Sequence, residues 1–240
     1  MTEARDRLIV ALDVSAAAEA RLIVQSLGKT VSTYKVGKQL FTAEGPAVVR
    51  EIVNAGHKVF LDLKFHDIPN TVAAAVSAAA KLGVSMLTVH ASGGQQMLTA
   101  AAEAADKSDS KPLILAVTVL TSLNDRDLQQ IGVSGRVLDQ VLRLAALAQN
   151  SGCHGVVASA LEARQLRSEL GSGFAIVTPG VRPSGGNPAD QARVATPGAA
   201  IAAGATHIVV GRPIIQAPDR AAAARAILEE ISSHQVAQSA

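Results

Sequence analysis

The segment 60–71, with the sequence FLDLKFHDIPNT, holds the densest group of residues that could do chemistry. Alternate side chains of a strand point to the same side, so Asp62 and Lys64 would lie together. Asp13 and Lys35 follow or occupy the two preceding apolar runs and could join them in a network of alternating charges. Such a group is costly to bury unless every member is paired. We interpret it as a catalytic or binding site; the alternative is a core salt bridge that only fixes the register of the strands.

Eight short apolar runs predict the strands that would position these residues. They are continuously hydrophobic, as expected for strands that are buried on both faces of a parallel sheet. The runs are Leu8–Asp13, Thr33–Gly37, Val59–Lys64, Met86–His90, Leu113–Leu120, Gly155–Ala158, Ala175–Thr178 and His207–Val210. Amphipathic stretches lie between them, with apolar residues at helical spacing in 72–79 and 137–148.

Eight strand–helix units in 240 residues predict the α/β class and a single (β/α)8 barrel domain over residues 1–240. A doubly wound open sheet is the alternative, but no Gly-x-Gly-x-x-Gly follows the first apolar run. No linker or low-complexity stretch suggests a domain boundary. We expect the polar end of the chain, residues 235–240, to fray.

A barrel of this kind carries its chemistry at the carboxyl ends of the strands and in the loops that follow. Besides the four charges named above, these positions hold Asp67, His90, Thr121, Ser122, Arg182, Gly211 and Arg212. The loops after the seventh and eighth strands often bind phosphate in this fold. Here they supply Pro179, Arg182, Gln191, Gly211 and Arg212.

Two features of these last loops favour a phosphate. Gly211 allows close backbone approach, and Arg212 offers a planar fork of donors. The segment 179–188 is rich in Pro and Gly and could close over a bound molecule as a lid. Arg182 could instead lie in a solvated loop, and Lys35 could instead be a surface lysine with a buried stem.

Composition and missing motifs argue against other functions. A formal net charge of +2 and 2% aromatic residues are not typical of a nucleic-acid binder. The sequence has no His-x-His, His-Glu-x-x-His or Gly-x-Ser-x-Gly pattern, so we expect neither a metal site nor a hydrolase. No run approaches the ~20 apolar residues of a membrane span, and no signal peptide pattern begins the chain. Cys153 is the only cysteine, which agrees with a cytoplasmic protein.

The segment from Asp62 to Thr71 closely resembles the signature of the orotidine 5′-phosphate decarboxylase family, in its bacterial type. The similarity extends over nearly the whole chain. It includes 11–13 (ALD), 35–37 (KVG), 89–91 (VHA), 119–122 (VLTS), 178–183 (TPGVRP) and 210–213 (VGRP). The bare Asp-x-Lys-x-x-Asp pattern is shared with related sugar-phosphate lyases, whereas the following HDIPNT makes the match specific.

The resemblance implies a (β/α)8 enzyme of pyrimidine biosynthesis that converts orotidine 5′-monophosphate to uridine 5′-monophosphate and CO2 without a cofactor. Lys64 would stabilise and protonate the C6 carbanion, and Asp62 would lie near the departing carboxylate. Lys35 would orient Asp62 and contact the ribose, whose hydroxyls Asp13 would bind.

The resemblance also implies a homodimer with shared active sites, in which Asp67 and Thr71 reach into the neighbouring subunit's site. Thr121 and Ser122 would hydrogen-bond the pyrimidine edge, although both could also be ordinary turn residues after a strand. The expected partners are therefore the substrate, the product and a second copy of the chain, with no nucleic acid and no membrane.

Two other functions stay open. A metal-dependent sugar-phosphate decarboxylase or aldolase would need acidic magnesium ligands, for which Asp13, Asp62 and Asp67 could serve, but Lys64 between them argues against a metal. A non-catalytic nucleotide-phosphate sensor would keep the barrel and bind without turnover. The intact set of Asp62, Lys64 and Asp67 argues against it.

Overall fold

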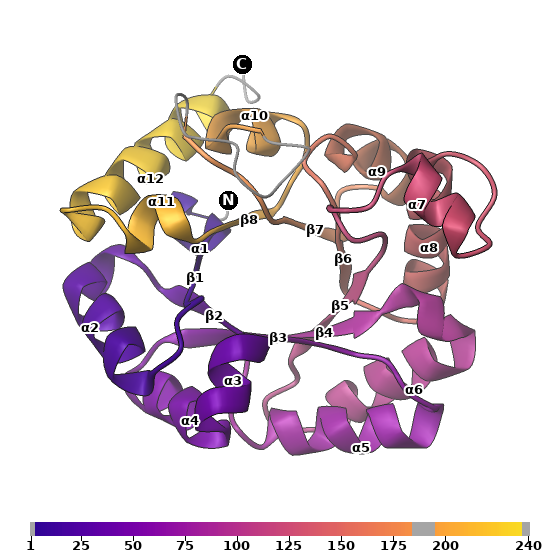
Figure 1. The fold of residues 1–240 in the computed structure, drawn as a ribbon, viewed down its shortest axis with the longest axis horizontal. Coiled ribbons are helices and arrows are strands. Elements are labelled where there is room, and N and C mark those ends of the chain that lie inside the picture. The colour runs from indigo at the N-terminus through magenta and orange to yellow at the C-terminus, as the bar shows by residue number, and fades with distance from the viewer. Residues whose placement is uncertain (1–2, 184–194, 237–240) are drawn as a thin grey trace.

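Residues 3–183 and 195–236 are described by the computed structural model. Its eight strands are parallel, pair in chain order and close into a barrel, with β1 next to β8 (Figure 1). They are β1 (Leu8–Ala11), β2 (Thr33–Gly37), β3 (Lys58–Phe65), β4 (Met86–His90), β5 (Leu113–Val117), β6 (Gly155–Val157), β7 (Ala175–Thr178) and β8 (His207–Val210). The predicted (β/α)8 fold is confirmed.

All eight predicted strands are present, and β2, β4, β7 and β8 have the predicted bounds. The strands β1, β5 and β6 end earlier than predicted, and β3 extends one residue further at each end. The prediction for β5 was too long because Val119 and Leu120 line a cavity instead of pairing with β6. Leu12 is apolar and fully buried although it lies beyond β1. Hydrophobicity at the strand ends therefore reports burial and not only strand pairing.

The strands bury both faces, which explains their continuous hydrophobicity. Ile9, Phe60 and Leu115 belong to a small apolar cluster that fills the barrel interior. The residues that alternate with them along each strand, such as Val10, belong to the larger cluster between the strands and the helices. Each large aliphatic side chain buried in this way contributes about 1.5–3 kcal/mol. The carboxyl ends of the strands consequently stand on a packed, rigid support.

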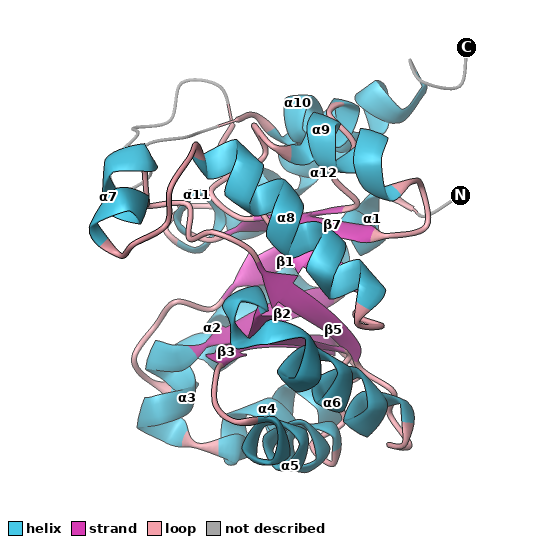
Figure 2. Ribbon diagram, turned by 90° about the vertical axis from the view of Figure 1, so that its right-hand side faces the viewer, coloured by secondary structure: helices cyan, strands magenta, loops and turns pink. Residues whose placement is uncertain are grey.

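Helices surround the barrel on all sides, and the two views show them as an outer layer around the strands (Figures 1 and 2). They are α1 (Ala4–Arg7), α2 (Ala17–Leu27), η1 (Gly28–Thr30), α3 (Lys38–Glu44), α4 (Pro46–Asn54), α5 (Pro69–Ala80), η2 (Ala91–Gly93), α6 (Gly94–Asp106), α7 (Asp125–Gln130), α8 (Val137–Asn150), α9 (Ala163–Leu170), α10 (Pro197–Ala202), α11 (Arg212–Ile215) and α12 (Arg220–Val236). The predicted apolar faces are confirmed: Val72 and Val76 of α5, and Val141 and Ala148 of α8, are buried.

The last helix, α12, continues to Val236. Buried Ile227 and Ile231 pack it against the body of the protein. The fraying expected for residues 235–240 stays a prediction. Residues 237–240 lie outside the described part of the chain. Within the described part, none of the helices combines the length and the apolar character needed to cross a membrane.

Candidate active site

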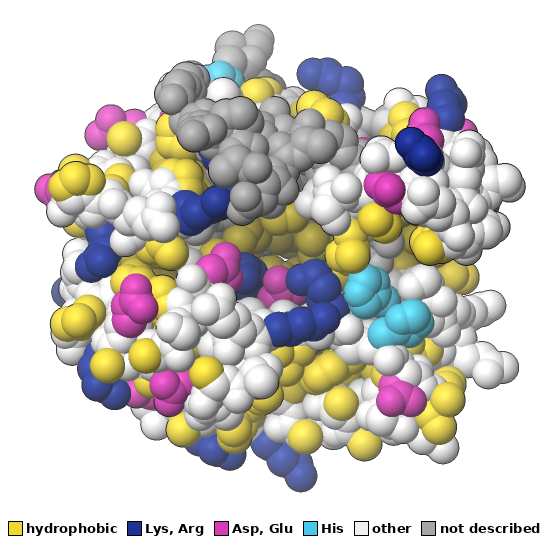
Figure 3. Space-filling model, in the orientation of Figure 1, with side chains coloured by type: hydrophobic (Ala, Val, Ile, Leu, Met, Phe, Trp, Pro, Cys, Tyr) yellow, Lys and Arg dark blue, Asp and Glu magenta, His cyan; other side chains and the backbone are white. Residues whose placement is uncertain are grey.

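A cavity of about 290 Å³ opens at the carboxyl ends of the strands. In the space-filling view, acidic and basic side chains lie next to each other in the hollow at the centre of this face (Figure 3). The lining residues come from β1, β2, β3 and β5 to β8 and the loops that follow them. They are Ala11, Asp13, Lys35, Phe60, Asp62, Lys64, Val117, Val119, Leu120, Thr121, Val157, Pro179, Gly180, Val181, Arg182, Val209, Gly211, Arg212 and Pro213. Their types divide the cavity into a charged side, an apolar side and a side with two arginines.

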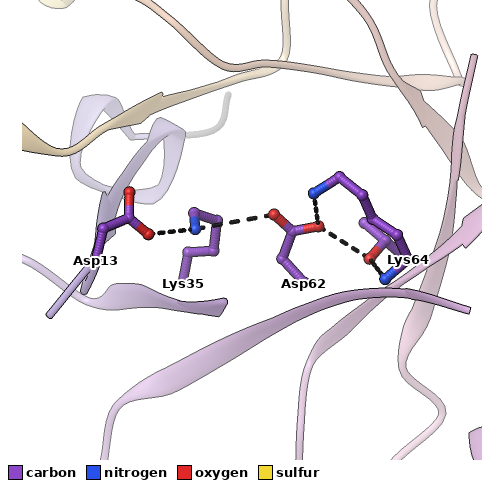
Figure 4. Close-up of polar contacts among 5 residues, drawn as sticks. Asp13, Lys35, Asp62 and Lys64 are labelled. Carbon is purple, nitrogen blue, oxygen red and sulfur yellow. Dashed lines mark hydrogen bonds and ion pairs between the residues drawn. The ribbon is translucent and has the colours of Figure 1, made fainter. Parts of the chain in front are cut away.

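Four charged side chains form a row of alternating sign along the β1–β3 side of the cavity (Figure 4). The Lys35 ammonium lies 2.8 Å from Asp13 Oδ1 and 3.8 Å from Asp62 Oδ2. The Lys64 ammonium lies 2.7 Å from Asp62 Oδ1. The network expected from the sequence is therefore present, with its four members contributed by three consecutive strands and the residues that follow them.

Burial differs along this charge row. The side chains of Lys35 and Asp62 are 12% and 13% exposed, Lys64 is 24% exposed and Asp13 is 54% exposed. Charges this deeply buried are tolerated because each faces an opposite charge at short range. Lys64 and Asp13, at the two ends of the charge row, are the members most accessible to a bound molecule.

The backbone of β3 is irregular at the lysine. Leu61 pairs with Leu87 and Phe65 pairs with Val89, so the register of β3 against β4 shifts between them. Lys64 has φ of 53°, in the left-handed region that side-chain-bearing residues rarely adopt. The alternation argument placed Asp62 and Lys64 on one side of a regular strand. Their proximity is confirmed, but the prediction that they lie on a regular strand is wrong.

Thr88, on β4, supports this irregular segment and was not singled out from the sequence. Its hydroxyl oxygen accepts a hydrogen bond from the Lys64 backbone N–H at 2.8 Å. The same hydroxyl donates to Asp62 Oδ1 at 3.0 Å. The only available signal was a polar residue inside the apolar run 86–90, which is too common a feature to identify a site.

Gly37 was also missed. A Cβ atom at this position would lie 3.0 Å from Lys35 Nζ and 3.6 Å from Asp13 Oδ1. Such a contact is tighter than most real ones, so an added Cβ would push the ammonium group by a few tenths of an ångström. The glycine thus leaves room for the Lys35–Asp13 ion pair.

The β7 and β8 side of the cavity, which adjoins Asp13 at Gly211, holds the residues predicted to bind phosphate. Pro179, Arg182, Gly211 and Arg212 all line it. A bridge between Val181 and Ala195 and the hydrogen bond from the Arg182 N–H to the Ala195 carbonyl hold the loop after β7. Gln191 and residues 184–188, which are half of the predicted lid 179–188, lie outside the described residues.

Three further predicted residues do not line this cavity. Asp67 is exposed, and its carboxylate accepts a hydrogen bond from the Ile68 N–H at 2.7 Å. Thr71 is exposed in the first turn of α5. Thr121 lines the cavity, whereas the neighbouring Ser122 is exposed and does not.

Two histidines lie beside the charge row. The rings of His66 and His90 are tilted, with centroids 5.5 Å apart. Burial lowers the pKa of His90, the neighbouring His66 and the positive charges of Lys38 and Lys64 lower it further, and Asp62 raises it. His90 is therefore neutral at neutral pH. In the described ranges, no three His, Cys, Asp or Glu side chains are arranged to hold a metal ion.

The fold and the cavity agree with the known proteins to which this chain is similar in sequence. A sequence model of the orotidine 5′-phosphate decarboxylase / HUMPS family matches residues 6–227. The orotidine 5′-phosphate decarboxylase of Halorhodospira halophila is 54% identical over 227 residues, which cover 95% of this chain and 96% of the relative. That of Sodalis glossinidius is 52% identical over 230 residues, covering 95% and 91%.

Solved structures of proteins with the same name share the fold. The crystal structure of the enzyme from Lactobacillus acidophilus is 40% identical, with a TM-score of 0.84 over 93% of this chain and 98% of that chain. The one from Pyrococcus horikoshii is 27% identical, with a TM-score of 0.77 over 94% and 99%. The chain therefore belongs to the orotidine 5′-phosphate decarboxylase / HUMPS family.

Proposed function

We propose that this protein is a decarboxylase that converts orotidine 5′-monophosphate to uridine 5′-monophosphate and CO2 in de novo pyrimidine biosynthesis. The observation that carries the proposal is the charge row that ends with the Lys64 ammonium inside the cavity. Family membership supports it, since relatives with at least half of their residues identical bear this enzyme's name.

The reaction needs strong stabilisation of an anion. When the bond from C6 to the carboxylate breaks, its electron pair stays on C6 in the plane of the pyrimidine, where the ring π-system cannot delocalise it. A preorganised positive charge next to C6 can stabilise that pair. We assign this role to the Lys64 ammonium, which then gives its proton to C6 while CO2 leaves. The chemistry requires no electron-accepting cofactor.

Asp62 has two effects in this mechanism. Its Oδ1 atom lies 2.7 Å from Lys64 Nζ and fixes the position of the ammonium. It would also repel a substrate carboxylate: two unit charges ~4 Å apart at an effective dielectric constant of ~20 interact by about 4 kcal/mol. That corresponds to roughly a thousandfold in rate. Because this is too little for so difficult a reaction, we place Lys64 first and repulsion by Asp62 second.

The rest of the cavity suits the rest of the nucleotide. Asp13 is accessible and can accept hydrogen bonds from ribose hydroxyls, and Lys35 next to it can donate one. Arg182 and Arg212, from the loops after β7 and β8, would bind the phosphate together with Gly211. A Cβ atom at Gly211 would make only ordinary contacts within the protein, so we attribute this glycine to the approach of a ligand.

Four assigned residues have weaker support from this chain alone. Thr121 would hydrogen-bond the pyrimidine edge together with Ser122, and Pro179 would line the phosphate loop. Gln191 would join the phosphate contacts, but nothing in the described residues bears on it.

The buried, unpaired Cys153 agrees with a reducing compartment, so we keep the cytoplasm as the expected location.

We further propose a homodimer with shared sites. Asp67 and Thr71 are exposed and do not line the cavity of their own chain. Ile68, which lies between them in the sequence, is 67% exposed. An exposed apolar side chain between two polar ones suits a contact with a second copy, into whose site Asp67 and Thr71 would reach. Mixing inactive Lys64→Ala and Asp67→Ala subunits should then restore activity, toward about a quarter of the wild-type value for random pairing. No recovery in mixed dimers would refute sharing.

The test of the reaction is the fall in ultraviolet absorbance when the purified protein meets orotidine 5′-monophosphate in EDTA. Conversion to uridine 5′-monophosphate would support both the reaction and its independence of a divalent metal. Activity that returns only with magnesium would favour a metal-dependent relative, and nucleotide binding without conversion would favour a sensor.

A matched pair of variants tests the role of Lys64. Lys64→Ala should nearly abolish turnover. Lys58→Ala should not, because Lys58 lies at the other end of the same strand and pairs with Asp6. Near-normal turnover by Lys64→Ala would refute the mechanism.

A further inference from the structure

We propose that Thr88 is a positioning residue that holds both the backbone of Lys64 and the carboxylate of Asp62 through one hydroxyl group. The proposal rests on the proposed function, because it names a residue on which the same site depends. Thr88 does not line the cavity and is fully buried, so it acts only through its two neighbours.

The first link is to the backbone of Lys64. The register shift between Leu61 and Phe65 removes Lys64 from regular pairing with β4. Its N–H donates instead to the Thr88 hydroxyl oxygen at 2.8 Å. Lys64 holds φ of 53°, a conformation that is unfavourable for a residue with a side chain. Such a conformation persists only where the surroundings maintain it.

The second link is to the carboxylate of Asp62. The Thr88 hydroxyl donates its one proton to Asp62 Oδ1 at 3.0 Å, the same oxygen that accepts from Lys64 Nζ at 2.7 Å. The hydroxyl thereby uses its donor and an acceptor at once. Asp62 cannot rotate without losing the Thr88 hydrogen bond, and the Lys64 ammonium would follow the carboxylate.

The side chain of Thr88 is itself well fixed. It is β-branched and so has few rotamers, and it lies between fully buried Leu87 and Val89 in a strand paired on both sides. One rigid oxygen thus sets where the lysine main chain and the aspartate side chain lie relative to each other. Positions of reacting groups matter greatly, since an error of about 1 Å can cost about a hundredfold in rate.

The test compares Thr88→Val, which has nearly the same shape but no hydroxyl, with Thr88→Ser, which keeps the hydroxyl. The matched control is Thr33→Val. Thr33 is also a buried threonine, but it is the first residue of β2, at the end of the strand that faces away from the cavity. We expect Thr88→Val to lower kcat about 10- to 100-fold, with KM changed by less than about threefold because the groups assigned to substrate binding remain. Thr88→Ser should recover most of this loss, and Thr33→Val should match the wild type.

A second measurement separates failure of this proposal from failure of the proposed function. Hydrogen exchange of the Lys64 amide needs no substrate, and it should be faster in Thr88→Val than in the wild type, Thr88→Ser and Thr33→Val. An active wild type with kcat unchanged in Thr88→Val refutes the positioning role. An inactive wild type refutes the proposed function, and the exchange rates then decide alone: unchanged exchange in Thr88→Val refutes the link to Lys64, and faster exchange supports it.

Discussion

Neutralising the whole charge row should leave the barrel about as stable as before and remove its activity. The variant changes Asp13 and Asp62 to Asn, and Lys35 and Lys64 to Met, so that size is nearly kept and all four charges are lost. This perturbation separates the two interpretations that the sequence left open. If the charges serve to fix the strand register, removing all four should lower the stability of the barrel. If they serve the function, the protein keeps them despite the cost of their desolvation, and removing all four should not lower its stability.

The structure gives the magnitude for the single changes. Lys35 Nζ lies 3.8 Å from Asp62 Oδ2, an attraction of about 4 kcal/mol at an effective dielectric constant of ~20. Removing one partner of a buried pair typically costs about 3–5 kcal/mol, because the other charge stays buried. Asp62 keeps Lys64 at 2.7 Å, so Lys35→Met should lower the free energy of unfolding by about 3 kcal/mol, at the low end of that range. For a chain of this size the melting temperature should fall by roughly 6–12 °C.

Removing more charges should then restore stability. Lys35→Met combined with Asp62→Asn leaves Asp13, which is half exposed, and Lys64, which is a quarter exposed. The double variant should therefore lose less than Lys35→Met alone. The fourfold variant buries no charge in the row and should return to within about 1 kcal/mol of the wild type, or exceed it.

The assay is equilibrium unfolding in urea at one fixed protein concentration, because association would make the stability concentration-dependent. Decarboxylation is measured on the same samples. If the losses of the single changes add up in the fourfold variant, the charges hold the barrel together and our interpretation is refuted. Recovered stability without activity would mean that the row is kept for function.

Three other residues yield further predictions. Gly37→Ala should lower kcat/KM about tenfold with little change in stability, because its Cβ would displace the Lys35 ammonium; unchanged steady-state kinetics would contradict this. Arg212→Ala should raise KM about tenfold or more and affect kcat less, since a charge-assisted contact to phosphate would be lost; an unchanged KM would exclude Arg212 from the phosphate site. Burial lowers the pKa of His207 from 6.5 to about 4, so below pH 6.5 the unfolded chain binds this proton first. Urea unfolding should therefore show the wild type losing roughly 3 kcal/mol between those pH values relative to His207→Asn, and parallel pH profiles would refute it.

The fold was predictable because its signals are local. Eight continuous apolar runs that alternate with amphipathic stretches admit few topologies, and the barrel rule then places polar residues such as Asp13 and Arg182 at one rim. Strand ends were less predictable. Val119 and Leu120 are apolar because they line the cavity, and not because they belong to a strand. Asp67 shows a different limit: a residue that would serve a second subunit is exposed in its own chain, and no pattern within one chain reveals its destination.

The pairing of Asp62 with Lys64 shows why a correct contact can follow from a wrong local geometry. Regular alternation would bring the two side chains together, but the strand is irregular there, with a register shift and a left-handed lysine. A left-handed lysine is unfavourable by itself, so no local rule predicts it, and its partner Thr88 lies 24 residues further along the chain. Among described residues other than glycine, Lys64 and Lys111 have positive φ, and of these two Lys64 lines the cavity. Backbone strain at Lys64 therefore supports its proposed role independently of its charge, because strained residues cluster at active sites.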